Sequence, residues 1–496
     1  MEEIRYRSTR NEKDVVTASQ AILNGLSRDG GLYMPEKIPA LDIVPAVLAG
    51  LSYQETAYEV MRRFYTDFTE EELKYCIAHA YDSKFDTEEI APLAEADGAY
   101  YLELFHGPTI AFKDMALSIL PYLMTTAAKK NEIRNEIVIL TATSGDTGKA
   151  ALAGFADVPR TKIIVFFPED GVSPVQKKQM VTQKGDNTFV VGVRGNFDDC
   201  QSGVKAMFGD KGLEAELDRK GYQFSSANSI NIGRLIPQVV YYVYAYGRLL
   251  AGRKIREGEA IHVVVPTGNF GNILAAYLAK GMGIPIERLI CASNDNRVLT
   301  DFFETGVYDK NRPFVLTSSP SMDILISSNL ERLIYEIAGK DAEKTSALME
   351  RLKSEGRYEL TADMREKLGD FVGGSAAEAE VSAEIAGVYQ KTGYLLDTHT
   401  AVASKVYRDY VGRTGDAKKA VIASTASPYK FTRSVMTAVD PAYGAMGDFE
   451  LADALSRLSK TEVPRAIEEI RSAEVLHKTV CEVDGMETEV RRFLGL

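Results

Sequence analysis

The sequence predicts an α/β protein with more than one parallel sheet. From about Asn135 onward, short runs that are apolar throughout alternate with longer helical stretches. Parallel strands that are covered by helices on both faces show such continuous apolar runs, whereas half-exposed strands alternate apolar and polar residues. At 496 residues, the chain is also longer than one hydrophobic core usually organises.

Six apolar runs are the expected strands of these sheets. They lie at residues 137–140, 162–167, 188–193, 261–265, 289–292 and 420–423, with helices expected at 149–156 and 174–183. The run from Val239 to Leu250 is the nearest candidate for a membrane span, but Arg248 interrupts it and it is shorter than the about 18 apolar residues that a span needs. We therefore expect a buried helix there.

The N-terminal part of the chain has a different pattern. Helical periodicity at 18–26, 55–66 and 70–79, with few convincing strands, predicts a small and mainly helical domain over residues 1–97. Residues 98–496 are then expected to hold two α/β lobes. Within them, the stretch 341–390 is rich in Ala, Glu, Lys and Arg and predicts surface helices.

Composition and charge narrow the classes of function. The net charge of −12 argues against nucleic acid as the main partner and against an anionic membrane surface, although a local site can still be positive. The four cysteines lie far apart and match no zinc-binding spacing, which predicts a reduced, cytoplasmic protein without a bound metal. The charged N-terminal residues lead into no apolar core, so we expect no secretory signal.

The first segment with chemical character is the turn Pro266–Asn272, which follows an expected strand and precedes a helical run at 273–280. Such a turn presents free backbone N–H groups and the positive end of a helix dipole, an arrangement that binds phosphate. It lacks the Lys-Ser/Thr ending of an ATP-binding loop and the three-glycine spacing of a dinucleotide fingerprint. Taken alone, the turn also fits a plain connection without a ligand.

The second segment surrounds Lys113. Apolar residues, Ile110–Phe112, precede this lysine, and a helical run at 115–123 follows it. Desolvation lowers the pKa of an ammonium and makes a lysine a usable nucleophile or Schiff-base partner. The alternative is a surface lysine whose stem covers apolar residues. The turn Gly107–Thr109 would fix the approach of the chain and favours the functional interpretation.

The third segment, Thr143–Gly148, gathers small hydroxyl residues and two glycines at the expected start of a helix. Backbone amides at such a position are suited to a carboxylate or a phosphate. Simple capping of the helix by Asp146 or Thr147 is the alternative.

The fourth segment, Ser424–Pro428, places hydroxyl groups at the carboxyl end of an expected strand, where α/β proteins bind ligands. The four segments together supply a lysine, a phosphate-binding turn, a carboxylate-binding loop and a hydroxyl pair. This set indicates an enzyme that uses pyridoxal 5'-phosphate, because the cofactor brings the electron sink and the protein supplies anchoring and orientation.

At this point the chain resembles the threonine synthase family, pyridoxal-phosphate enzymes of fold type II (tryptophan synthase β-like). The resemblance spans essentially the whole chain and rests on these motifs in a consistent order: Ser8-Thr-Arg, Gly25-Leu-Ser-Arg-Asp-Gly-Gly-Leu-Tyr, Glu103-Leu-Phe-His-Gly-Pro-Thr-Ile-Ala-Phe-Lys113-Asp, Ser144-Gly-Asp-Thr-Gly, Gly268-Asn-Phe-Gly-Asn, Ser318-Ser-Pro-Ser-Met-Asp-Ile and Ser328-Asn-Leu-Glu-Arg. It implies two α/β lobes with the cofactor in the cleft between them.

The resemblance implies roles for individual residues. Lys113 would be the catalytic residue, holding the cofactor as a Schiff base and moving protons. The cofactor-binding residues would be Lys113, Gly268, Asn269, Phe270, Gly271, Asn272 and Thr425, the last contacting the pyridine nitrogen with Ser424 nearby. The substrate carboxylate would bind at Ser144, Gly145, Asp146 and Thr147. We add the hypothesis that Asn231 and Arg234 help to hold the substrate phosphate, since arginine binds such oxyanions with two N–H groups; a helix-surface role for Arg234 is the alternative.

The implied reaction converts O-phospho-L-homoserine and water into L-threonine and phosphate, by γ-elimination and β-hydration, as a carbon–oxygen lyase acting on phosphates. The alternatives are another fold type II lyase, such as a threonine or serine dehydratase or a related phospholyase, and a non-catalytic binding protein with this fold. Departures from the family pattern, Ser427-Pro-Tyr-Lys and Asp397-Thr-His-Thr, affect fine geometry and not the cofactor. We expect a small-molecule substrate, no nucleic acid or membrane partner, and a monomer or small homo-oligomer. For His106 and His399, structural roles are the default expectation.

Overall fold

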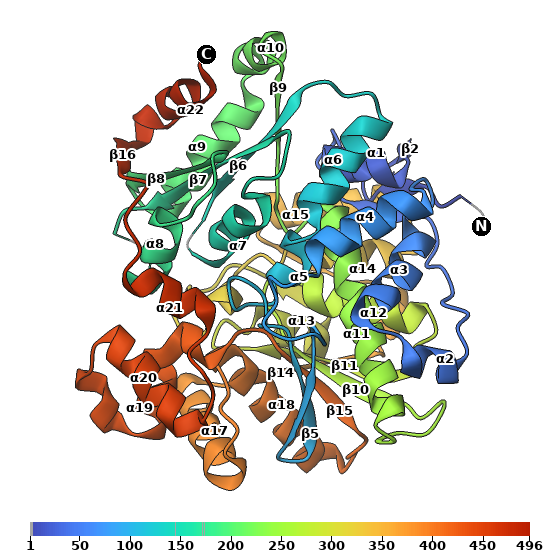
Figure 1. Ribbon diagram of the computed structural model, residues 1–496. Helices are drawn as coiled ribbons and strands as arrows, with labels where there is room; N and C mark the ends of the chain where they lie inside the picture. The colour runs from blue at the N-terminus through green and yellow to red at the C-terminus, as the bar shows by residue number, and fades with distance from the viewer. Residues whose placement is uncertain (1–2, 144, 171, 173) are drawn as a thin grey trace.

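The computed structural model describes residues 3–496 apart from 144, 171 and 173. Its larger lobe is built on a six-stranded sheet with the order β14-β11-β10-β15-β5-β4 (Figure 1). These strands are β4 Leu93–Ala96, β5 Ala99–Glu103, β10 Ile261–Pro266, β11 Ile286–Ser293, β14 Phe371–Ser375 and β15 Ala420–Ser424. All neighbouring strands are parallel except β4, which pairs antiparallel with β5. The carboxyl ends of the parallel strands therefore meet at one edge of the sheet.

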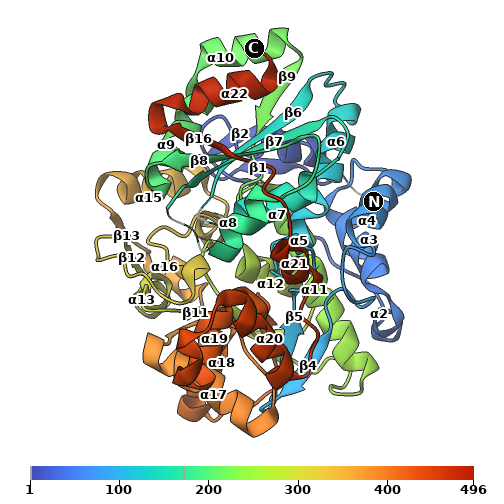
Figure 2. The same cartoon turned by 60° about the vertical axis from the view of Figure 1, so that its left-hand side comes forward.

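The smaller lobe is built on a five-stranded sheet with the order β16-β8-β7-β6-β9, and all its pairs are parallel. Its strands are β6 Glu136–Ala142, β7 Thr161–Pro168, β8 Thr188–Arg194, β9 Tyr222–Ser225 and β16 Thr479–Glu482. The helices of this lobe are α7 Asp146–Phe155, α8 Pro174–Val181, α9 Phe197–Gly209, α10 Lys211–Arg219 and α22 Met486–Leu494. Figure 2 shows the C-terminal segment returning to this lobe, where β16 extends the sheet and α22 lies beside α9.

Helices cover both faces of the larger sheet and connect the two lobes. They are α5 Asp114–Leu117, α6 Leu120–Lys130, α11 Ile232–Ala251, α12 Gly271–Gly281, α13 Val298–Thr305, α14 Leu330–Ile337, α15 Ala342–Ser354, α16 Ala362–Glu366, α17 Glu378–Thr392, α18 Thr398–Thr414, α19 Thr432–Val439, α20 Asp448–Ser459 and α21 Arg465–Arg471. Two short antiparallel strands, β12 Val307–Asp309 and β13 Arg357–Glu359, form a separate ribbon. Among the residues that the structure describes, no helix combines the length and apolar character that a membrane crossing requires.

The N-terminal segment consists of α1 Ala18–Asn24, α2 Pro45–Gly50, α3 Tyr53–Phe64 and α4 Glu70–Ala80, with a three-stranded sheet of β1 Tyr6–Ser8, β2 Asn11–Val16 and β3 Tyr33–Pro35. Helices α1, α3 and α4 begin with capping boxes at Thr17, Ser52 and Thr69, which satisfy backbone N–H groups at the helix starts. Helices α2 and α3 pack on α11, which is buried along most of its length. The N-terminal helices therefore share one hydrophobic core with the larger lobe.

The fold class, α/β with two parallel-sheet lobes and fold type II, is confirmed, and each of the six expected strands is present. The boundary at residue 97 stays a prediction; β4 lies before it but belongs to the sheet of the larger lobe. The expectation of surface helices over 341–390 is confirmed for α15, α16 and α17 and is wrong for Arg357–Glu359, which forms β13, and for Phe371–Ser375, which forms β14. Gly373 and Gly374 hide this strand in the sequence. A Cβ on Gly373 would lie 2.9 Å from the Thr300 carbonyl oxygen, so the close packing of α13 requires a residue with low strand propensity.

Candidate active site

Lys113 lies at the start of α5, at the edge where the parallel strands of the larger sheet end. The backbone N–H of Phe112 donates to the carbonyl oxygen of Thr425 at 2.8 Å, and Ala111 forms an isolated bridge with Ala426. This pairing brings the second and fourth segments of the sequence together. The predicted lysine and the predicted hydroxyl pair thus share one end of the sheet.

The turn before the lysine is fixed by a buried carboxylate. Asp114 accepts hydrogen bonds from the Thr109 N–H at 2.8 Å and from the Thr109 hydroxyl at 2.6 Å. A Cβ on Gly107 would lie 2.5 Å from the Asp114 Cβ, so only glycine fits this close approach. Ile110 has a left-handed backbone conformation, with φ of 53°. These constraints fix the path of the chain into Lys113, as the Gly107–Thr109 turn predicts.

The amine of Lys113 is buried in a polar environment. Its Nζ lies 3.5 Å from Asp146 Oδ2 and 3.4 Å from Ser321 Oγ. Burial lowers the pKa of Lys113 to about 8, against the opposing effect of the Asp146 carboxylate, and the charges of Lys430 and Arg234 lower it further. A substantial fraction of this amine is therefore neutral near physiological pH, as nucleophilic attack requires.

The turn Gly268–Asn272 connects β10 to α12, as expected. The hydroxyl of Ser327 donates to the Gly268 carbonyl at 2.6 Å, and the side chain and backbone N–H of Asn329 both donate to the Asn269 carbonyl. A Cβ on Gly268 would lie 2.3 Å from the Ser321 carbonyl oxygen. The carbonyl groups of Gly268 and Asn269 are thus engaged by Ser327 and Asn329. The N–H groups in the first turn of α12 have no partner within the helix, and they remain available for an anion.

Asn272 adds a side-chain donor to this turn. Its Oδ1 accepts a hydrogen bond from the Tyr242 hydroxyl, which orients the amide. Its Nδ2 is buried and has no partner among the described residues. A buried donor without an acceptor is costly unless a ligand satisfies it, so the free amide of Asn272 suits an anion such as a phosphate.

A fully buried arginine connects this turn to the N-terminal segment. Arg332 donates from Nε to the Tyr33 carbonyl at 3.0 Å, from Nη2 to the Ile230 carbonyl at 2.5 Å, and from Nη1 to the side chain of Asn329. Asn329 in turn holds the Asn269 carbonyl. The N-terminal segment thus supports the anion-binding turn through one guanidinium.

The segment Thr143–Gly148 forms the start of α7, with Ser144 outside the described residues. The Thr143 hydroxyl accepts hydrogen bonds from the N–H groups of Gly145 and Gly148, each at 3.0 Å, which fixes the loop. Thr147 lies in the first turn of the helix. Backbone amides at this end of α7 keep the arrangement that suits a carboxylate.

Asp146, the first residue of α7, does not offer its side chain to a carboxylate. Its Oδ1 lies 2.8 Å from Lys430 Nζ and accepts from Gln176 Nε2 at 2.7 Å, and its Oδ2 accepts from the Ser321 hydroxyl at 2.9 Å. Although burial acts to raise it, the pKa of Asp146 is held well below its usual range by Lys430 and Lys113. An ionised carboxylate repels a second one, so only the backbone of Asp146 is suited to the role expected for it.

Asn231 and Arg234, for which we predict contacts with the substrate phosphate, differ in how far their side chains are already engaged. Asn231 caps α11, accepting from the Gly233 N–H at 2.8 Å, and its Nδ2 donates to the Ile22 carbonyl at 2.9 Å. Both ends of this amide are engaged, which favours a structural role. Arg234 is buried and so has no helix-surface role; it donates from Nη1 to the Ala227 carbonyl at 2.8 Å, and its Nε has no partner among the described residues.

Residues without an expected role also reach the site. The three whose side chains contact Asp146 are Gln176, Ser321 and Lys430. Ser321 and Lys430 stand in motifs named above and lie close to a proline, and this turn signal was the available indication. Gln176 also follows a proline, Pro174, but belongs to none of those motifs. His399 accepts from the Ser321 N–H at 3.2 Å through Nε2, with Nδ1 3.1 Å from Asp397. His106 lies between Asp86 and Glu103, at 2.5 and 2.9 Å.

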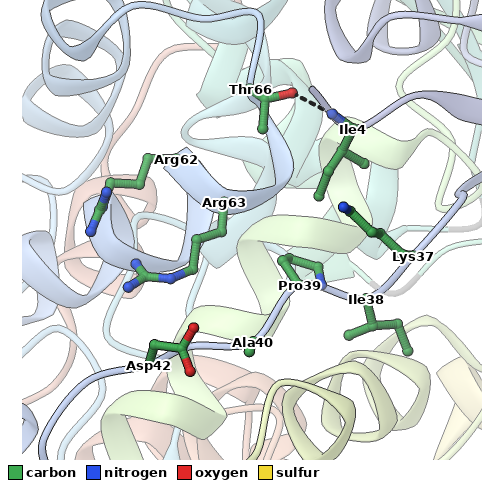
Figure 3. A pocket seen from close by; sticks show the side chains of 9 residues that line it. All are labelled: Ile4, Lys37, Ile38, Pro39, Ala40, Asp42, Arg62, Arg63 and Thr66. Atoms are coloured by element: carbon green, nitrogen blue, oxygen red, sulfur yellow. Dashed lines mark hydrogen bonds between the residues drawn. The ribbon is translucent and has the colours of Figure 1, made fainter. Parts of the chain in front are cut away.

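A hollow of about 420 Å³ lies in the N-terminal segment, where the chain from Lys37 to Asp42 passes α3 (Figure 3). The N–H of Ile4 donates to the Thr66 hydroxyl at 2.9 Å at its rim. Arg62 and Arg63 line it as well, but none of its lining residues belongs to the site around Lys113.

Comparisons with known proteins agree with this geometry. The family model described as "Pyridoxal-phosphate dependent enzyme" matches residues 87–425, "Threonine synthase N terminus" matches residues 5–81, and "Threonine synthase, C-terminal" matches residues 400–480. Threonine synthase of Pseudomonas aeruginosa is 38% identical over 440 residues, which cover 87% of this chain and 90% of that protein. The chain belongs to the threonine synthase family.

Solved structures show the same likeness over the whole chain. A PLP-bound threonine synthase from Brucella melitensis superposes with a TM-score of 0.88 at 36% identity, covering 99% of this chain and 100% of that one. The yeast threonine synthase gives a TM-score of 0.87 at 32% identity. Human threonine synthase-like 1 is 43% identical over 434 residues, and this chain spans 58% of its length.

The site fits the cofactor of this family, pyridoxal 5'-phosphate. The buried amine of Lys113 is suited to its aldehyde, and the Gly268–Asn272 turn, with the free Nδ2 of Asn272, is suited to its phosphate. Gly268 leaves no space for a side chain beside Ser321. The protein is therefore a pyridoxal-phosphate-dependent enzyme.

Proposed function

We propose that the protein is a carbon–oxygen lyase acting on phosphates, which converts O-phospho-L-homoserine and water into L-threonine and phosphate. The relatives named threonine synthase, which match over most of the chain, support this activity. The single observation that carries the proposal in the structure is the position of Lys113. Its amine contacts Asp146, at the helix start suited to a substrate carboxylate, and Ser321, whose carbonyl oxygen packs against Gly268 of the turn suited to the cofactor phosphate.

Each residue of the site then has a defined task. The cofactor, when bound, supplies the electron sink that stabilises negative charge at the substrate carbons. Lys113 holds the cofactor through its Nζ and, once released, removes and returns protons at Cα and Cβ of the substrate. The amides of residues 144–147 bind the substrate carboxylate. Ser424 and Thr425, at the end of β15, would supply a hydroxyl group and not a carboxylate to the pyridine nitrogen.

Arg234 is the residue we assign to the substrate phosphate. Burial lowers the pKa of its guanidinium to about 10, so that it stays cationic near neutral pH, and its Nε is free of partners among the described residues. Arg234→Ala should raise the substrate KM by about tenfold or more, because a charged hydrogen bond to phosphate is lost. Unchanged KM and kcat would remove this assignment. Asn231, with its amide engaged, remains a weaker prediction for the same role.

The decisive experiment measures the products formed from O-phospho-L-homoserine. The purified holoenzyme should release threonine and inorganic phosphate in equal amounts, and Lys113→Ala should lose the activity entirely. 2-Oxobutyrate as the main product would instead indicate a dehydratase or a related phospholyase. The second candidate rests on one observation: a relative that is 43% identical is named threonine synthase-like 1, not threonine synthase. A chain that fails to bind pyridoxal 5'-phosphate would contradict both.

We further infer a small-molecule substrate, no nucleic acid or membrane partner, a monomer or small homo-oligomer, and a cytoplasmic location. The acidic net charge of −12 supports the inference of no nucleic acid or membrane partner.

A further inference from the structure

Lys430 is a buried cation to which the reaction proposed above assigns no role. It lies in a short 3₁₀ turn, Pro428–Phe431, that follows β15, and its side chain is 2% exposed. Its Nζ lies 2.8 Å from Asp146 Oδ1, but no atom of the described residues accepts a well-aligned hydrogen bond from it. An ammonium has three donors, so at least two N–H groups of Lys430 are buried without an acceptor among the residues that the structure describes. This arrangement is costly unless a ligand completes it.

The position of this ammonium points to the substrate. Asp146, which Lys430 contacts, also contacts Lys113 through its other oxygen, so a single carboxylate separates the two lysine amines. Lys430 belongs to the larger lobe, whereas Asp146 begins α7 of the smaller lobe. The free donors of Lys430 therefore lie where the two lobes meet, beside the loop suited to the substrate carboxylate.

A purely structural ion pair does not account for these features. The carboxylate of Asp146 already has hydrogen bonds from Ser321 and Gln176. Among the described residues, the buried charges of the site are also unbalanced: the cations are Lys113, Lys149, Arg234 and Lys430, and the acids are Asp114, Asp146 and Asp397. Burial raises the pKa of Asp114 and lowers that of Lys149, and these two shifts have opposite effects on the charge balance, so the excess of cations rests on Lys113, Arg234 and Lys430. Such an excess of buried positive charge calls for anionic ligands.

We propose that Lys430 is a substrate-binding residue, whose ammonium donates to an oxyanion of the substrate on the side of the site next to Asp146. The oxyanion is a carboxylate or a phosphate, and both are groups of the substrate under the proposed function, on which this inference rests. The substrate would then meet two buried cations besides Lys113: Arg234, and Lys430 next to Asp146.

The test measures ligand binding to the holoenzyme and not turnover, so that it is independent of which product the enzyme forms. Wild type, Lys430→Met and Lys430→Arg are titrated with inorganic phosphate and, separately, with L-2-aminobutyrate, which carries a carboxylate but no phosphate. Binding is followed by calorimetry and by the absorbance of the bound cofactor. The dissociation constant for one of the two probes should rise roughly 10- to 100-fold in Lys430→Met, because a charge-assisted hydrogen bond is lost. It should rise less in Lys430→Arg, which keeps the charge.

The probe that responds identifies the group that Lys430 binds. Unchanged dissociation constants for both probes in a folded, cofactor-loaded Lys430→Met variant would overturn the proposal. If this variant does not fold or load, Lys430→Gln takes its place, since it keeps an N–H donor and loses only the charge.

A double variant separates substrate binding from compensation of Asp146. If Lys430 only neutralised this carboxylate, adding Asp146→Asn to Lys430→Met would restore the wild-type affinities, and the proposal would fail. We expect the affinity to stay low. Lys130→Met is the matched control, because Lys130 forms a partly buried ion pair with Glu72 at 3.1 Å outside the site. Its affinities for both probes should equal those of wild type.

Discussion

The two segments that we predict to bind anions have similar positions in the fold but are held in different ways. Pro266–Asn272 and Thr143–Gly148 each follow a buried parallel strand and lead into a helix. In the first, Ser327 and Asn329 hold the backbone carbonyl groups, and Arg332 fixes Asn329 from behind. In the second, the Thr143 hydroxyl fixes the loop locally, and Asp146 makes its contacts with side chains across the site.

The difference corresponds to two kinds of ligand. A turn whose backbone is held by buried hydrogen bonds keeps one geometry and suits a cofactor phosphate that stays bound. A loop whose charged residue is shared with Lys113 and Lys430 couples anion binding to the chemistry of the lysine. This second arrangement suits a substrate that binds and leaves in each cycle. The following experiments test this contrast.

The largest effect is expected from Gly268→Ala. The new Cβ would lie 2.3 Å from the Ser321 carbonyl oxygen, so the backbone of the turn must move. A displacement of this kind should weaken binding of pyridoxal 5'-phosphate by about 100-fold, measured by equilibrium titration of the apoenzyme. Gly412→Ala in α18 is the matched control, because nothing lies within 4 Å of the added Cβ and Gly412 has no predicted contact with the cofactor. Equal losses in both variants would show that the effect does not come from the turn at Gly268.

The next effect concerns the support behind the turn. Arg332→Met removes the buried donors to Tyr33 and Ile230 and frees Asn329, which should lower the free energy of unfolding by about 3–5 kcal/mol. In the protein that remains folded, cofactor affinity should fall as well, whereas Arg332→Lys should recover part of it. Arg297→Met, at a half-exposed ion pair with Asp301, should change stability by less than about 1 kcal/mol. Full cofactor affinity in folded Arg332→Met would contradict a supporting role.

A pH profile tests the second segment. The neutral form of Lys113 captures the cofactor, and its pKa is about 8, so the capture rate of the apoenzyme should rise as pH increases through 8. Asp146 acts to raise this pKa, because its negative charge stabilises the ammonium. Asp146→Asn should therefore shift the profile toward lower pH, as followed by stopped-flow absorbance. A shift toward higher pH would refute this coupling.

The smallest effect concerns His106, which precedes Lys113 in the chain and lies outside both segments. Burial acts to lower its pKa, but Asp86 and Glu103 raise it to about 9. A raised pKa in the folded state means that the stabilisation is complete below the unfolded value near 6.5 and is lost as pH rises through about 9. The free energy of unfolding of wild type, measured by urea titration, should therefore exceed that of His106→Gln at pH 6.5, and this difference should disappear as the pH rises through about 9. A constant difference across this range would exclude a charged His106.

The sequence by itself determined the fold class and the cofactor, and it located the two strand-to-helix segments that we predict to bind anions. Continuous apolar runs predicted β6, β7, β8, β10, β11 and β15, because buried parallel strands leave that pattern. The turn at Gly268–Asn272 was predictable for the same reason, since a glycine-rich connection between strand and helix has a local signature. Lys113 was identified through its motif and its apolar neighbours.

Only the tertiary structure decided how charges combine in the site. Lys430 lies 284 residues after Asp146 in the numbering, and their 2.8 Å contact depends on the packing of two lobes. Ser321, Gln176 and Arg332 likewise act through partners distant in sequence. Local patterns report burial and turn geometry, whereas the balance of charge around Lys113 is a sum over groups that only the folded chain brings within a few ångströms.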